Sequence, residues 1–170
     1  MQYNIPDQLQ QDKPLYTSIF GTPVFANIEF LAGTYQNKQG QNVNYQKVVL
    51  ESFVLSLSRT KNIIMTEIPG RDGTVKEITG AGDHVISIRG VIAGANGHYP
   101  IDEVRRLKDV LDAGDVASPI SVSSAFLNAM DVFFLQVTDY EFPQQEGGYS
   151  SQQFTINAIS DMPAILAMTS

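Results

Sequence analysis

Alternation of apolar and polar residues dominates this chain and predicts that most of it is β-strand. Two segments show the alternation clearly, residues 22–33 and residues 45–59. In the second segment, serines alternate with the apolar residues. A period of two places alternate side chains on opposite faces of a strand, so each segment is predicted to be a half-buried strand. The alternating apolar residues are Val24, Ala26, Ile28, Phe30, Val49, Phe53, Leu55 and Leu57.

Further strands are predicted along the rest of the chain, with Gly, Asp, Asn or Pro at most of the junctions. They cover residues 62–68, 74–78, 84–93, 131–142 and 151–161. Between the first two strands, the polar tract at residues 34–44 has one glycine and is too long for a tight turn. It is predicted to be a solvated hairpin loop.

The spacing changes to a helical one after Pro100. Proline has no N–H to donate, which costs nothing at the first helical position, and Gly114 is predicted to end the helix. The residues expected on its apolar face are Ile101, Val104, Leu107 and Leu111. A second, shorter helix is predicted within residues 123–130, with Ser123 or Ser124 as its N-cap.

These elements predict an α+β fold, a mainly antiparallel sheet with one principal helix packed on it. The sheet could be open or partly closed into a barrel. Residues 1–20 are rich in Gln, Asn and Pro and show no period, so they are predicted to form an extended N-terminal arm. Residues 21–170 are predicted to form a single domain, without internal repeats.

Composition narrows the function classes. The chain has 170 residues, no cysteine and a net charge of -7. Disulfides, thiol chemistry and cysteine-ligated metals are excluded, and the negative charge opposes nucleic acid and anionic membranes as partners. The first twenty residues lack the basic and apolar regions of a signal peptide, and no segment is long and apolar enough to span a membrane. We expect a soluble protein of the cytoplasm.

Two glycine-bearing stretches have a composition that could form ligand loops. Gly70 to Gly73 (GRDG) follows a proline and predicts a turn, whose adjacent charges could dock on a neighbouring subunit. Gly80 to Asp83 (GAGD) resembles half of a dinucleotide fingerprint, but Val85 stands where the third glycine belongs and a strand follows. This second stretch is predicted to be a corner of the sheet.

No standard catalytic signature occurs in the sequence, and the protein is predicted not to be an enzyme. Asp83, Asp139 and Glu141 could in principle supply a glycosidase pair, which leaves a hydrolase as a minor alternative. A carbohydrate- or peptide-binding module is a second alternative, although tryptophan is absent. His84 and His98 lack acidic partners at ligand spacing, so no metal and no cofactor are expected.

Arg89 shares strand parity with Val85 and Val91, which places it on the more polar face of its strand. A solvated position is expected. An inward position would require an acidic partner such as Asp72 or Glu77, because an unpaired buried charge is costly.

The run from Ile68 to Ile92, followed by Tyr99-Pro100 and EVRRLKDVLDAG, resembles tail proteins of phages and of contractile injection systems. It is similar to the tail protein U family and to the conserved portion of LysM-type baseplate proteins. In those proteins a Gly-Arg-rich turn, a Gly-Asp strand start and a Leu-rich helix follow in this order. The resemblance covers residues 47–161 and includes no LysM module, so peptidoglycan binding is not carried over.

The resemblance implies a virion or injection-particle subunit that forms a ring, expected to be hexameric, where the inner tube meets the baseplate hub. A terminator or connector at the tail end is an alternative. Unpaired sheet edges and the N-terminal arm independently favour completion by sister chains. The expected partners are sister copies, tail tube and hub. The subunit-interface candidates are Arg71, Asp72, Lys76, Glu77, Asp83, Arg89, Tyr3, Ile5, Leu15 and Tyr16.

Overall fold

A computed structural model describes residues 27–113, 119–144 and 149–161, together with Gly21 and the backbone of two short strands near the N-terminus. These strands, β1 (Tyr16–Thr17) and β2 (Pro23–Val24), pair with each other. The rest of the predicted N-terminal arm and the helix end predicted at Gly114 lie outside the described residues.

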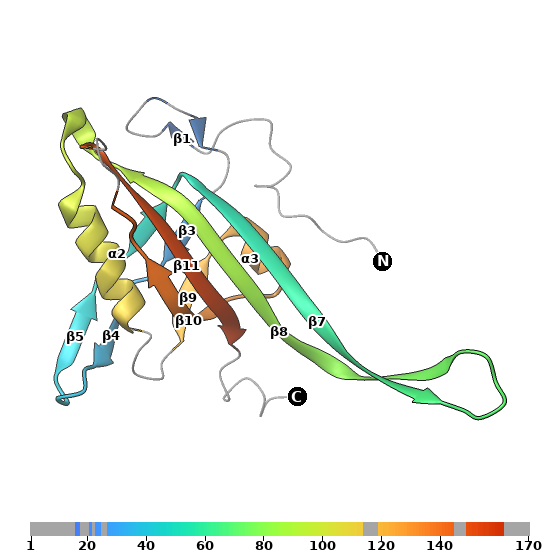
Figure 1. The fold of residues 1–170 in the computed structure, drawn as a ribbon. Helices are drawn as coiled ribbons and strands as arrows, with labels where there is room; N and C mark the ends of the chain where they lie inside the picture. The colour runs from blue at the N-terminus through green and yellow to red at the C-terminus, as the bar shows by residue number, and fades with distance from the viewer. Residues whose placement is uncertain are drawn as a thin grey trace.

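Seven strands form one antiparallel sheet in the order β6-β3-β9-β10-β11-β8-β7 (Figure 1). The predicted α+β class, dominated by antiparallel strands with one principal helix, is therefore confirmed. The strand bounds are β3 Ile28–Phe30, β6 Val48–Leu50, β7 Phe53–Glu67, β8 Thr74–Ala93, β9 Ile120–Ser123, β10 Phe134–Glu141 and β11 Ser151–Asp161.

The sheet is not closed, so the open form of the prediction is correct and the barrel is not formed. β6 and β7 are the two edge strands of the described sheet, yet only Glu51 and Ser52 connect them. The sheet must therefore curl far enough for these two residues to bridge its edge strands, which do not pair with each other. The N–H of Val91 donates to the carbonyl of Ser52 over 3.1 Å, which holds the crossing connection against β8.

One apolar core lies inside the curled sheet and includes residues from both helices, α2 (Ile101–Ala113) and α3 (Ala125–Ala129). Ser124 is the N-cap residue of α3, as predicted, but its side chain makes no capping hydrogen bond. The largest fully buried side chains are Phe30, Ile28, Ile86, Ile88, Leu107, Leu111, Ile120, Leu127, Leu135, Ile156, Val110 and Val132. We call this sheet, with β7 taken up to Ser58 and β8 from His84 onward, together with its two helices, the body.

The apolar face of α2 differs in one respect from its prediction. Leu107 and Leu111 are buried, as expected, and Val110 is buried with them. Ile101, at the start of the same face, is less covered than the others and remains 43% exposed. The apolar period continues into the first turn of the helix, but none of the described elements covers that turn enough to bury it.

Three predicted segments are divided differently in the structure. Residues 22–33 form β2 and β3 instead of one strand, and residues 45–59 are divided at Glu51 and Ser52. The tract at residues 34–44 is a paired hairpin, β4 (Gly33–Gln36) and β5 (Asn42–Tyr45), and only residues 37–41 form its turn. Asn37 Oδ1 accepts from the backbone N–H groups of Gln39 and Gln41, which closes this turn locally.

Within the described residues, no helix combines the length and the apolar character needed to cross a membrane.

Candidate subunit interface

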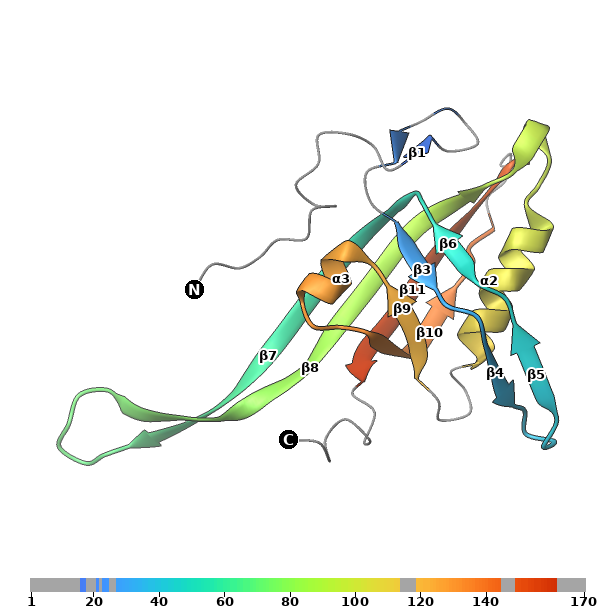
Figure 2. The same cartoon turned by 180° about the vertical axis from the view of Figure 1, so that it is seen from behind.

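β7 and β8 extend far beyond the body as a two-stranded ribbon, which we call the projecting hairpin (residues 59–83; Figures 1 and 2). β11 pairs with β8 only between Val85 and Ala93. Beyond that point, the described strand partner of β8 is β7 alone. The projecting hairpin therefore has two open backbone edges and two faces that no other described element covers.

Apolar side chains are exposed on both faces of the projecting hairpin. Ile63 and Ile78 are direct cross-strand partners and share a face, where they are 42% and 69% exposed. Met65 shares that face and is 62% exposed, whereas Ile64 points to the other face and is 51% exposed. An isolated two-stranded ribbon is marginally stable in water, and clustered exposed apolar residues mark interaction sites. This surface is the best candidate for a binding interface among the described residues.

The tip of the projecting hairpin is the turn predicted from GRDG. The N–H of Arg71 donates to the carbonyl of Ile68 over 3.2 Å, and Gly70 between them has a φ of 80°. Pro69 at the first central position and a glycine with positive φ at the second fit a type II turn. Arg71 and Asp72 are both exposed just past it.

The predicted sheet corner at Gly80 to Asp83 is wrong, because these residues lie within the continuous strand β8. The register shifts twice here, once between Arg59 and Lys61 and once between Asn62 and Ile63 of β7, each time with an extra residue on β8. Arg59 Nε donates to the carbonyl of Gly82 over 2.8 Å and braces the first bulge. Bulges increase local twist and interrupt the ladder, so the glycines serve a bent strand instead of a corner.

The projecting hairpin carries no net charge. It holds four basic residues and four acidic residues, against -7 for the whole chain, so the excess negative charge lies elsewhere. The charged residues of the hairpin are Arg59, Lys61, Glu67, Arg71, Asp72, Lys76, Glu77 and Asp83.

Five predicted interface residues lie on the projecting hairpin: Arg71, Asp72, Lys76, Glu77 and Asp83. All five are exposed, and their role at an interface stays a prediction. Tyr3, Ile5 and Leu15 lie outside the described residues, and only the backbone of Tyr16 is described, in β1.

Arg89 lies in the body and away from these five residues. It is exposed beside buried Ile88, which confirms its predicted parity. Its strand partners are Val54 and Thr155, whereas Glu77 pairs with Ile64 in the projecting hairpin. The alternative of an inward Arg89 paired with Asp72 or Glu77 is therefore wrong.

Sequence reasoning missed the apolar residues of the hairpin as interface residues. Three consecutive apolar residues, Ile63, Ile64 and Met65, give a strand two apolar faces, which a sheet with one solvated face does not need. That break in the alternation was the available signal.

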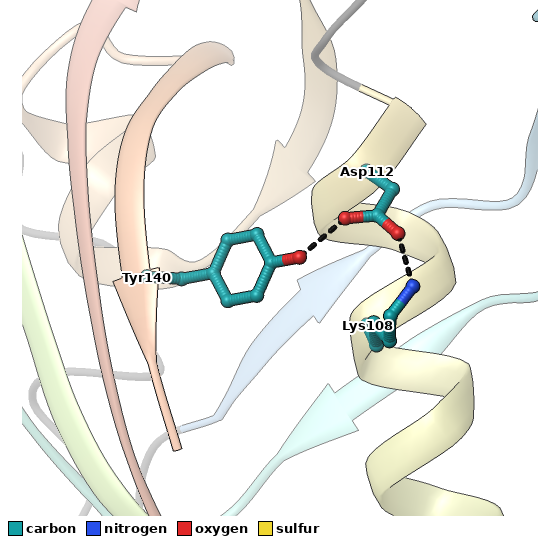
Figure 3. Close-up of polar contacts among 3 residues, drawn as sticks. All are labelled: Lys108, Asp112 and Tyr140. Atoms are coloured by element: carbon teal, nitrogen blue, oxygen red, sulfur yellow. Dashed lines mark hydrogen bonds and ion pairs between the residues drawn. The ribbon is translucent and has the colours of Figure 1, made fainter. Parts of the chain in front are cut away.

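A polar cluster at the inner side of α2 has a structural role in the body (Figure 3). The hydroxyl of Tyr140 on β10 donates to one carboxylate oxygen of Asp112, and Lys108 forms an ion pair with the other. The hydrogen bond to Asp112 raises the pKa of Lys108 above its ordinary value. The cluster ties the last turn of α2 to the sheet.

The carboxylates considered for hydrolysis are placed in ordinary structural surroundings. Asp139 accepts from Asn157 Nδ2 over 2.7 Å across neighbouring strands, and Asp83 is exposed at a bulge. His84 donates its backbone N–H to Ser160 Oγ over 2.9 Å. Among the described residues, no cluster of three or more histidine or acidic side chains could hold a metal ion.

Two similar solved structures come from phage tails or tail-like particles. The Dit protein of phage SPP1, titled a paradigm of the hub adsorption apparatus in phages infecting Gram-positive bacteria, has a TM-score of 0.43 and 13% identity over 81% of this chain. This chain spans half of the Dit chain's length. The tail of an empty GTA particle, computed with C6 symmetry, has a TM-score of 0.41 and 14% identity over 78% of this chain and 95% of its own. Both TM-scores lie below 0.5, so neither likeness supports a conclusion about this chain.

No curated protein matches the chain by sequence. One family model does match, over residues 48–170, which include the projecting hairpin, α2 and the closing strands β10 and β11. The match covers well over half of the sequence. The chain therefore belongs to the family described as Domain of unknown function (DUF6046).

Proposed function

We propose that the protein is a structural subunit of a phage tail or of a contractile injection system, and that it acts by assembly. The proposed assembly is a ring of sister copies, sixfold, that joins the inner tube to the baseplate hub. The single observation that carries the proposal is the projecting hairpin, which exposes apolar side chains on both faces beyond the body. The proposal assigns no reaction to the chain.

The projecting hairpin supports assembly because its apolar side chains are not fully buried in a single copy. Full burial of an aliphatic side chain contributes roughly 1.5–3 kcal/mol, and five such side chains are only partly covered here. They are Ile63, Ile64, Met65, Ile68 and Ile78. Contact with neighbouring subunits would remove their exposed area from water and would order a ribbon that is otherwise marginal.

Two further features support the proposal. The edge strands β6 and β7 leave backbone donors and acceptors unpaired within the described sheet, and closed symmetry is the usual way to remove such edges in an oligomer. The sequence between Ile68 and Ile92, which carries the resemblance to tail proteins, is the part of the chain that builds the turn and β8. The more specific likeness to the tail protein U family stays a prediction.

A position at the tail end, as a terminator or connector, is the alternative within the same class. In either position we propose sister copies, tube and hub proteins as partners, and assembly inside the host cell. Electron microscopy of particles that contain the protein distinguishes the two positions and counts the copies per ring. A copy number of one per particle would contradict the ring.

The test replaces residues 60–83 with Asn-Gly, which suits a two-residue turn because Arg59 and His84 are direct strand partners. We expect the body to fold and incorporation into particles to be lost when the variant is expressed with the neighbouring tail genes. Gln39→Ala, in the exposed turn between β4 and β5, is the matched control and should be incorporated normally. Normal incorporation of the shortened variant would contradict the proposal.

A further inference from the structure

The segment of β7 from Lys61 to Glu67, KNIIMTE, has a symmetric order of side chains. A charged residue stands at each end, with opposite signs, and Asn62 and Thr66 follow as the inner polar pair. Three apolar residues lie between them, centred on Ile64. Such a strand is complementary to a second copy of itself when the two run antiparallel.

We propose that two copies of the protein associate through this segment, by antiparallel pairing of β7 with the partner's β7 about a two-fold axis at Ile64. The inference goes beyond the proposed function, and the occupant to which it commits is a second copy of this chain. The four-stranded sheet that results is β8-β7-β7-β8.

The edge of β7 in the projecting hairpin is suited to this pairing and the edge of β8 is not. Both register shifts place the extra residue on β8, at Thr79 and at Gly82 to Asp83, while β7 continues without an insertion. A bulged strand twists and leaves residues unpaired, which protects its edge from strand addition. All residues of β7 from Arg59 to Glu67 are exposed.

In the two-fold register, the residues that lie opposite each other are chemically complementary in every pair. Lys61 lies opposite Glu67 of the partner subunit, an attractive charge pair, and the symmetry repeats it at the other end. Asn62 lies opposite Thr66 of the partner subunit. Ile63 lies opposite Met65 of the partner subunit, and Ile64 lies opposite Ile64 of the partner subunit. Such cross-strand pairs are the units that stabilise a sheet.

Neighbouring registers lose this match. A shift of the axis to Ile63 would place Lys61 against an apolar residue, Met65, and a shift to Met65 would place Ile63 against Glu67. A shift by one position in a single strand would also exchange its two faces. The axis at Ile64 is therefore the register that the side chains specify.

Charge favours contact at this place over contact between bodies. The projecting hairpin has no net charge, whereas the whole chain carries -7, so two bodies repel each other. Antiparallel pairing sets the two bodies at opposite ends of the joined hairpins, because each hairpin projects from its own body (Figure 2). The apolar residues on both faces then form wider four-stranded surfaces, which remain available to other subunits.

A two-fold contact joins two copies only, so the ring contacts of the proposed function must come from other surfaces. The two proposals therefore stand or fail separately. Particle incorporation tests the first, and the behaviour of the purified protein alone tests the second.

Cysteine cross-linking tests the register directly, since the chain contains no cysteine of its own. Ile64→Cys should form a disulfide-linked dimer under mild oxidation, because the two-fold axis brings the introduced thiol of one copy opposite the same thiol of the other. Ile63→Cys alone should not, whereas Ile63→Cys mixed with Met65→Cys should. Equal cross-linking of Ile64→Cys and Ile63→Cys, or none by Ile64→Cys, would overturn the proposal.

A charge exchange tests the same register without oxidation. Lys61→Glu places like charges opposite each other at both ends and should raise the dimer dissociation constant about tenfold. Lys61→Glu combined with Glu67→Lys restores both pairs and should restore the affinity. Sedimentation of the full chain measures both, with thermal unfolding as the check on folding. A wild-type chain that stays monomeric at about 100 μM, or a double exchange that does not restore the affinity, would contradict the proposal.

Discussion

The body and the projecting hairpin are built from the same two strands and differ in what lies on them. In the body half of β8, Ile86 and Ile88 are completely buried. In the hairpin half, Ile78 of the same strand is 69% exposed and its cross-strand partner Ile63 is 42% exposed. Both halves have paired backbones. The difference is what packs on these strands, since core residues from the helices and from distant strands cover only the body half.

This comparison separates two sources of order. Cross-strand hydrogen bonds exist in both halves, but each contributes only about 1 kcal/mol net. The hydrophobic core exists in one half. Stability should therefore be concentrated in the body, while the projecting hairpin is free to respond to partners.

The largest expected difference is between Ile88→Ala in the body and Ile78→Ala in the projecting hairpin. Loss of the buried side chain should reduce the free energy of unfolding by about 2–5 kcal/mol, because it leaves a cavity. The exposed counterpart should change it by no more than about 0.5 kcal/mol. Urea denaturation of dilute protein measures both, and equal losses would refute the comparison.

A smaller difference is expected between two glycines of β8. A Cβ on Gly90 would approach the carbonyl oxygen of Ser52 to 2.2 Å and the Phe154 ring to 2.7 Å, so Gly90→Ala forces the connection away from the sheet. It should cost about 1–3 kcal/mol.

At Gly82 in the projecting hairpin, the nearest atom to a Cβ is the carbonyl oxygen of Thr60, at an ordinary 3.4 Å. Gly82→Ala should therefore cost less than about 1 kcal/mol. Thermal unfolding of the two variants side by side measures the difference, and a greater loss for Gly82→Ala would count against our account of the body.

Side-chain contacts between elements distinguish the body further. Tyr140→Phe removes the hydroxyl that donates to Asp112 and should lower stability by about 0.5–1.5 kcal/mol. Tyr149→Phe is the matched control, since Tyr149 is 85% exposed, and should have no measurable effect. Chemical denaturation of both proteins decides the matter, and an equal effect would mean that α2 is not held by this contact.

The smallest expected effect is the pH dependence of the Lys108 ion pair. The hydrogen bond to Asp112 raises the pKa of Lys108 above its ordinary 10.5. The ion pair therefore contributes fully to the stability of the fold below pH 10.5. This contribution is lost as the pH rises through the raised pKa of Lys108 in the folded protein. The contribution is small because the Lys108 side chain is 55% exposed. Lys108→Met should flatten this part of a stability curve measured at alkaline pH, and an unchanged slope would contradict the assignment.

Much of the fold could be predicted because local patterns dictated it. The alternation in residues 84–93 placed Ile86 and Ile88 on one face and Arg89 on the other, as observed. The break between β6 and β7 was not predicted, although Glu51 stands at an apolar position of the alternation, between Val49 and Phe53. The chain turns there to reach the opposite edge of the sheet, a position set by strand order.

The candidate interface was predicted only in part. The turn at Gly70 to Gly73 was found from its residues, and the charges near it were proposed as contacts. For the apolar residues beside them, only a strand was predicted. Periodicity reports which side chains share a face and says nothing of whether another element covers that face.

By itself, the sequence determined the strand-forming segments, the start of the main helix after Pro100 and the tight turn at Pro69-Gly70, since each depends on neighbours a few residues apart. The tertiary structure alone decided that β8 continues through its glycines as a bulged strand. It also decided that the same pair of strands is covered within the body, whereas no other described element covers it beyond the body. Coverage depends on where remote segments pack, and that is settled by the whole chain at once.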